Sequence, residues 1–234
     1  MNKRIAWNWI KFLGFEKSGN IKATSLVELM ISIIVVSVMV LSFQSLETFG
    51  HNQVVSADRR AKVQNDLAYC LEHMAKYVKQ AAGNGNLNVN YPAILLYPTA
   101  AGTKTGFQVR VDLNDPQTPS NFSDDALVYY TLALAGNALS TGCTPQGTGT
   151  CGSFSAETLS TKIVANFNNG ILPVIPLYTS SDGFYVSIDA SGNFVDIGLV
   201  GRYYPTKVPT AASKLTNPQV ALKTRLICNN TSSH

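Results

Sequence analysis

One carboxylate, that of Glu28, stands near the start of an otherwise apolar stretch, residues 23–43. No residue from position 29 to position 43 carries a charge. An isolated carboxylate inside a membrane costs a few kcal/mol, so an acid buried there usually has a cationic partner. The placement of Glu28 therefore predicts an ion pair that forms in an apolar environment. The alternative is an acid at the membrane surface, favoured there by the positive end of a helix dipole.

The four cysteines are the second set of residues with chemistry of their own. Cys143 and Cys151 enclose seven residues, and a disulfide between them would remove roughly 2.5 kcal/mol of unfolded-state entropy. Cys70 falls in a helical pattern and Cys228 follows the last predicted strand, so a bridge between these two would tie the C-terminus to the helix. Four cysteines allow three connectivities, and this second pairing stays open.

Three groups of oxygen-bearing side chains have the residue types that calcium binds, but none has a complete calcium-loop pattern. In the longest group Gly192 is misplaced for an EF-hand loop and no bidentate glutamate follows. We therefore expect no metal site, and we interpret residues 189–193 as the turn of a hairpin. The three groups are Asp189, Ser191, Asn193 and Asp196; Asp112 with Asp115; and Asp124 with Asp125.

Motifs of enzymes are missing from the sequence. It contains no Gly-x-Ser-x-Gly, no phosphate-binding loop and no His-Glu-x-x-His. His51, His73 and His234 have no obvious partners in the sequence, and we interpret His73 as a helix-surface residue. We expect neither an enzyme nor a bound cofactor.

The positive charge of the chain is confined to its first 23 residues. That segment holds five basic side chains against the single acid Glu16, and the whole chain has a formal net charge of +4. The remainder is neutral and offers no broad basic surface to nucleic acid. Because positive residues stay on the cytoplasmic side of a membrane, we expect the rest of the chain to face outward. In an oxidising compartment, cysteines tend to form disulfides.

The helical pattern continues beyond the apolar stretch, over residues 51–83. Apolar residues recur there every three or four positions, which is typical of an amphipathic helix with one buried stripe. Gly50 is a candidate break, and Gly83 is the expected stop. The expected stripe is Val54, Ala57, Ala61, Gln64, Leu67 or Ala68, Leu71, Met74 or Ala75, Val78 and Ala82.

The remaining residues, 84–234, predict strands and turns. Alternating or β-rich runs indicate strands over residues 107–111, 126–134, 163–167, 175–178, 184–188, 194–200 and 220–226. Segments rich in Pro, Thr, Asn and Gly indicate surface loops over residues 112–123, 135–156 and 203–218. The fold class is therefore α+β, with a long N-terminal helix packed on a C-terminal antiparallel sheet domain.

The residues around Glu28 resemble the N-terminal segment of type IV pilins and type II secretion pseudopilins. In that family a basic leader ends in a small residue, and Glu is the fifth residue after the cut. Here Ala23 stands where Gly is usual, and Thr24 stands where Phe or Met is usual. The resemblance implies cleavage between Ala23 and Thr24, N-methylation of Thr24, and an ion pair between Glu28 and the new N-terminal amine.

The charged helix and the Asp124-Asp125 step before a strand look most like minor pilins of the PilW type. The resemblance then implies four regions: a leader at 1–23, a transmembrane and assembly helix at 24–50, an amphipathic helix at 51–83 and a β-rich head at 84–234. It implies a pilin-like fold and residence in the inner membrane with a periplasmic head, followed by incorporation at or near the tip of a pilus.

The partners that the resemblance implies are other major and minor pilins, the prepilin peptidase, the inner-membrane assembly platform and a tip adhesin. Two alternatives stay open. One is a type II secretion minor pseudopilin of the J kind. The other is a signal-anchored binding or adhesion domain that never polymerises.

Overall fold

The computed structural model describes residues 25–84, 91–96, 103–114, 116–117, 121–133, 137–164, 183–189, 194–207, 216–228 and 230–232. The chain divides into two compact units, Met1–Gly50 and His51–His234. One helix, α2 (Leu26–Lys79), supplies the described part of the first unit and the first element of the second.

Within the first unit α2 is apolar on every face. Its side chains are exposed throughout, with Leu26 74% accessible to solvent. The helix continues through Gly50, so it has no break at this candidate position. A glycine inside a helix costs only about 1 kcal/mol relative to alanine, and the surrounding helical sequence tolerates that cost.

In the second unit α2 buries a single stripe of side chains at three- and four-residue spacing. The stripe starts at Val63 and not at Val54, which is 69% exposed, so the expected face was wrong over its first turns. The helix ends at Lys79, four residues before the expected stop at Gly83. The buried residues of this stripe are Val63, Leu67, Cys70, Met74, Tyr77 and Val78.

Gly83 lies in strand β1 (Ala82–Asn84) and has a φ of 129°, a conformation that L side chains rarely adopt. A Cβ at this position would approach the carbonyl oxygen of Tyr91 to 2.7 Å. The glycine is thus needed for a close approach of two backbone segments after the helix, and not for the helix stop itself.

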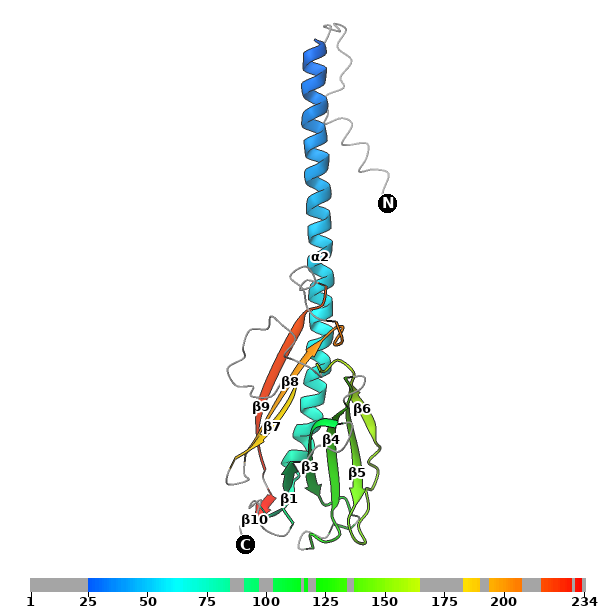
Figure 1. The fold of residues 1–234 in the computed structure, drawn as a ribbon, viewed down its shortest axis with the longest axis vertical. Helices are drawn as coiled ribbons and strands as arrows, with labels where there is room; N and C mark the ends of the chain where they lie inside the picture. The colour runs from blue at the N-terminus through cyan, green and yellow to red at the C-terminus, as the bar shows by residue number, and fades with distance from the viewer. Residues whose placement is uncertain are drawn as a thin grey trace. The chain divides into compact units, whose positions relative to one another are not determined.

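The described residues of the second unit form three sheets (Figure 1). The largest is antiparallel, in the order β2 (Ile94–Leu96), β3 (Thr103–Val111), β4 (Ala126–Ala133), β5 (Leu139–Pro145) and β6 (Glu157–Ser160). The second, also antiparallel, has the order β7 (Phe184–Ile188), β8 (Phe194–Arg202) and β9 (Gln219–Ile227). The short strands β1 and β10 (Asn230–Ser232) pair in parallel. The predicted α+β arrangement of a long helix and antiparallel sheets is confirmed.

Several predicted elements differ in detail. Residues 135–156 were expected as a loop, yet β5 lies within them because it pairs along β4 from Leu139 to Pro145. Of the strand expected at 163–167, only the bridge of Ile163 to Gly201 is found among the described residues. The strand expected at 175–178 falls outside the described residues. The 184–188 and 194–200 hairpin strands and the alternating 220–226 strand are confirmed.

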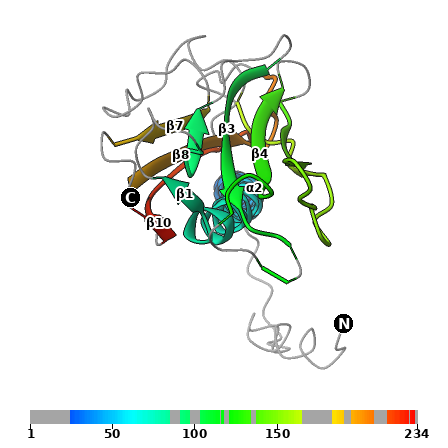
Figure 2. The same ribbon diagram turned by 90° about the horizontal axis from the view of Figure 1, so that it is seen from below.

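The core lies where α2 meets both antiparallel sheets (Figure 2). Phe107 of β3 stacks on Tyr130 of β4 with ring centroids 5.0 Å apart, and it also contacts Phe184 of β7 at 6.1 Å. On β8, a Cβ at Gly201 would lie 3.0 Å from a methyl carbon of Leu67, so this glycine lets the helix approach the strand closely. One helical stripe therefore supports two sheets.

The position of the stripe predicts how substitutions along α2 affect stability. Leu67→Ala should lower the free energy of unfolding by about 2–5 kcal/mol, because it leaves a cavity between α2 and β8. Val54→Ala on the same helix should change it by less than about 0.5 kcal/mol. Chemical denaturation of both variants in detergent measures the difference, and equal effects would contradict the observed start of the stripe.

Candidate functional site

Glu28 lies in the first turn of α2, and its side chain is exposed. The backbone N–H groups of Glu28 and Leu29 donate to the carbonyl oxygen of Ser25 at 2.9 and 3.1 Å. No ion pair of the Glu28 carboxylate is present among the described residues. The helix dipole alone favours an acid here, since unsatisfied N–H groups give the N-terminus partial positive charge.

Four hydroxyl groups of this half of α2 donate hydrogen bonds within the helix. Ser32 donates to the carbonyl oxygen of Glu28 at 2.8 Å, and Ser37, Ser42 and Thr48 each donate to the carbonyl four residues earlier. A hydroxyl that bonds its own backbone needs no water, so it is compatible with a lipid or protein environment. These four hydroxyl groups thus do not oppose burial.

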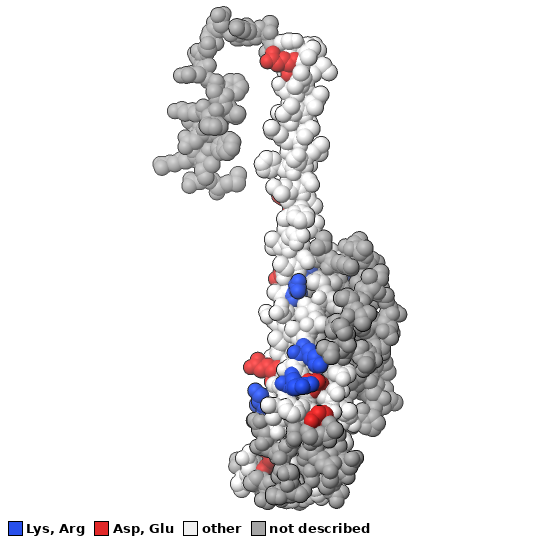
Figure 3. Space-filling model, turned by 90° about the vertical axis from the view of Figure 1, so that its left-hand side faces the viewer, with Lys and Arg blue, Asp and Glu red and all other residues white. Residues whose placement is uncertain are grey.

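By length and composition α2 can cross a membrane. Its most apolar window has a mean hydropathy of 2.6, and none of that window is buried within the chain. Figure 3 shows this part of the helix as almost entirely uncharged, with acidic atoms at its start, where Glu28 lies. The apolar surface needs a partner outside the described residues, whether lipid, a signal-sequence receptor or other helices.

The predicted cleavage site residues Ala23 and Thr24 lie outside the described residues.

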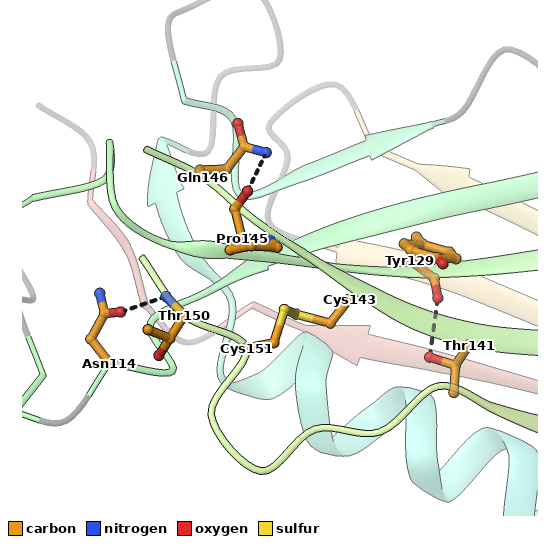
Figure 4. Close-up of a disulfide and its surroundings, with 8 residues drawn as sticks. All are labelled: Asn114, Tyr129, Thr141, Cys143, Pro145, Gln146, Thr150 and Cys151. Atoms are coloured by element: carbon orange, nitrogen blue, oxygen red, sulfur yellow. Dashed lines mark hydrogen bonds between the residues drawn. A yellow bond between two sulfur atoms is a disulfide. The ribbon is translucent and has the colours of Figure 1, made fainter. Parts of the chain in front are cut away.

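The predicted disulfide between Cys143 and Cys151 is confirmed, with the two Cα atoms 6.0 Å apart. Cys143 belongs to β5, where it pairs with Val128 of β4, and Cys151 lies in the following loop. Asn114 holds this loop from outside, because its Oδ1 accepts from the Thr150 N–H at 3.0 Å (Figure 4). Its Nδ2 donates to the carbonyl oxygen of Asp124 at 3.0 Å. The loop is therefore held both by the disulfide and by the hydrogen bond to Asn114.

The structure does not form the second bridge, between Cys70 and Cys228. Both are buried thiols, and burial raises the pKa of Cys70 to about 12 and that of Cys228 to about 11. The Cys70 thiol experiences the charge of Asp66 on its own helix, whereas that of Cys228 experiences Asp189 after β7. Both residues belong to the buried core of the second unit.

His73 is not the surface residue that the sequence indicated. Its Nδ1 lies 3.0 Å from the Tyr130 hydroxyl of β4, and its Nε2 lies 3.6 Å from the Glu157 carboxylate of β6. Aromatic rings surround the imidazole, those of Tyr69, Tyr77, Tyr130 and Phe154. Burial lowers the pKa of His73, although the charge of Glu157 opposes this shift. The imidazole joins α2 to the large sheet.

A buried carboxylate, that of Asp125, lies directly before β4. Asp125 is only 1% exposed, and burial raises its pKa to about 6 against the opposing charge of Arg110. Arg110 of β3 donates from Nη1 to the carbonyl oxygen of Phe122 at 2.7 Å. Among the described residues, Nε of Arg110 and Oδ2 of Asp125 have no hydrogen-bond partner. This arrangement offers no complete ligand set among the described residues.

The candidate calcium residues are otherwise engaged. Asp196 accepts two hydrogen bonds from Arg225, at 2.8 and 2.9 Å, and lies 3.5 Å from the Lys223 ammonium. Asp189 accepts from the Phe194 N–H at 2.8 Å, as expected for a hairpin end. Ser191, Asn193 and Asp115 lie outside the described residues. Within the described part of the chain, no three His, Cys, Asp or Glu side chains are grouped as a metal site.

Comparison with protein-family models, with curated proteins and with solved structures finds no match to this chain. The functional argument therefore depends on the geometry of two features. These are the uncovered apolar part of α2, with Glu28 in its first turn, and the disulfide-bonded β-sheet unit.

Peptide mapping without reduction should recover Cys143 linked to Cys151, and Cys70 and Cys228 as thiols that react only after unfolding. Replacing both linked cysteines by serine should lower the free energy of unfolding by roughly 2.5 kcal/mol, because the unfolded chain regains the entropy of an eight-residue separation. A peptide that joins Cys70 to Cys228 would contradict the structure.

The lowered pKa of His73 makes stability depend on pH in a defined direction. In the range below its ordinary pKa the unfolded chain binds more protons at His73, so the contribution of this residue to stability should fall on acidification from about pH 7.5 to about pH 5. Asp125, whose pKa burial raises to about 6, contributes with the opposite sign, so the His73 contribution is measured as the difference between the unaltered chain and a His73 variant. His73→Phe keeps the ring packing and should weaken this dependence in thermal unfolding. The exposed His51, changed to Gln, is the matched control and should leave the pH dependence unchanged.

Proposed function

We propose that this chain is a minor pilin subunit of the PilW type, assembled into a type IV pilus at or near its tip. The observation that carries the proposal is Glu28. It is an acid in the first turn of a helix whose apolar side chains are exposed and uncovered. A simple membrane anchor needs apolar length only and has no use for this carboxylate.

Cleavage between Ala23 and Thr24 would create an amine four residues before Glu28. In a bundle of similar helices, two opposite charges that are buried together offset part of each other's desolvation cost. Removing one partner would leave an uncompensated charge, which costs several kcal/mol. The carboxylate would thus favour insertion of a correctly processed subunit, through the amine of Thr24 on its own chain or on a neighbour.

The second unit supports the same proposal. A disulfide is typical of proteins folded outside the cytoplasm, and the Cys143–Cys151 bridge lies in a sheet domain that follows the apolar helix. A short loop fixed by a disulfide keeps its shape without a large core. The proposed partners are other pilins, the prepilin peptidase, the assembly platform in the inner membrane and a tip adhesin.

The proposed mechanism is assembly and not catalysis. The helix of residues 26–50 would leave lipid for a bundle of sibling helices, while the sheet unit makes lateral and tip contacts. The helix gains no apolar burial by this transfer, since lipid and helix surfaces are similarly apolar. The Glu28 ion pair would then supply a specific preference for the bundle.

Glu28→Leu should still insert into the membrane and still be cleaved, yet fail to restore pili in a strain that lacks the gene. Glu28→Asp should restore them partly, because the charge remains while its reach is shorter by one methylene. Pili would be counted by electron microscopy, and the mass of the membrane-bound subunit would report cleavage.

Glu47→Leu is the matched control, since it makes the same substitution at an exposed acid of the same helix. It should restore pili like the unaltered chain. Normal piliation by Glu28→Leu would overturn the proposed mechanism.

A further inference from the structure

A group of cations surrounds two adjacent tyrosines in the second unit. The Tyr203 and Tyr204 rings meet edge to face, with centroids 4.8 Å apart. The Arg59 guanidinium lies over both rings, 5.1 Å from one centroid and 5.6 Å from the other. Lys162 lies 5.0 Å above Tyr203, and Lys207 lies 4.7 Å above Tyr204. We call Arg59, Lys62, Lys162, Tyr203, Tyr204 and Lys207 the Arg–Tyr patch.

Backbone groups hold the patch in place. Arg59 donates from Nη1 to the carbonyl oxygen of Thr216, and Lys162 donates from Nζ to that of Tyr203 at 3.0 Å. The Asn217 side chain accepts from the Tyr204 N–H at 2.8 Å and donates to the Tyr204 carbonyl oxygen at 3.0 Å. The acceptors of Arg59 and Lys162 are carbonyl oxygens without net charge. They therefore position these cations without neutralising them.

The positive charge of the patch is largely uncompensated. Among the described residues no carboxylate forms an ion pair with Arg59, Lys162 or Lys207. Lys62 is the exception, because it lies 2.8 Å from the Asp58 carboxylate. Tyr204 is 38% exposed and Lys207 is exposed, so the patch reaches solvent.

The geometry favours a phosphate-bearing ligand over a nucleic-acid base. A base would need a free aromatic face on which to stack, whereas here cations lie over both tyrosine rings. Arginine and lysine bind phosphate oxygens through charge-assisted hydrogen bonds. Tyrosine beside basic residues is also the composition found at membrane interfaces.

The chain itself keeps this patch near the bilayer when residues 26–50 span it. Arg59 follows Gly50 by nine positions, and even a fully extended chain of that length reaches only about 30 Å. This bound holds whatever the arrangement of the two units. The Arg–Tyr patch therefore cannot move far from the lipid headgroups.

We propose that the Arg–Tyr patch binds the phosphate groups of anionic phospholipids while the subunit resides in the membrane. This inference rests on the membrane insertion in the proposed function and adds a lipid contact made by the sheet unit. The contact orients the unit on the membrane surface before assembly. It weakens at high salt, since exposed charges are screened beyond about 8–10 Å.

The test uses the full chain in nanodiscs of phosphatidylcholine, alone or mixed with an equal amount of phosphatidylglycerol. Acetylation of each lysine is followed by mass spectrometry. Lys162 and Lys207 should react about threefold more slowly in the anionic discs, as expected for basic groups held at an anionic surface. Lys79 and Lys223 are internal references and should react equally in both.

Two variants separate a specific patch from general attraction. Lys207→Glu should remove the lipid-dependent protection of Lys162, whereas Lys79→Glu, with the same change of charge at an exposed position, should preserve it. Equal acetylation of Lys162 in both discs overturns the lipid contact but leaves the pilin proposal intact. Failure of the chain to enter discs overturns both. Protection that appears only when other pilins are added overturns the lipid contact and identifies an acidic protein partner.

Discussion

The second unit depends on one buried stripe of α2 that two antiparallel sheets share. Leu67 and Val63 pack against Gly201 of β8, while Phe107 and Tyr130 of the large sheet join the same core. Neither sheet has a second described helix to cover it, because α2 is the only helix among the described residues. Protein interiors are close-packed, so the shared stripe must fit both surfaces at once. The positions of β3 and β8 are therefore linked through the helix.

Polar groups in this core are placed where partners from another element reach them. His73 of α2 meets Tyr130 and Glu157 of the large sheet, and the Ser160 hydroxyl donates to the Asp66 carboxylate. A buried polar group without a partner is costly, so each such contact specifies one packing of helix on sheet. These contacts fix the orientation of α2 on the large sheet, whereas the apolar residues of the core supply most of the stabilisation.

In the first unit the same helix is not covered by any other described part of the chain. Residues 26–50 present apolar side chains on every face, and nothing described in this chain covers them. They require an apolar environment from outside, and lipid followed by a bundle of similar helices would supply it in turn. Glu28 makes such a transfer selective in the proposed mechanism, and the Arg–Tyr patch would hold the sheet unit at the membrane until the transfer occurs.

Local patterns were enough to predict the long helix, its apolar stretch up to residue 43 with one carboxylate, the hairpin of β7 and β8, and the Cys143–Cys151 disulfide. Each depends on residues close together in the chain, so periodicity and spacing carry the information. Pairing over long separations was not predictable. It alone places residues 139–145 in a strand against β4, brings His73 to the Tyr130 hydroxyl, and brings Arg59 beside Tyr203. The same holds for the burial of the thiols Cys70 and Cys228, which follows from how the helix and the last strand pack and not from the number or spacing of the cysteines.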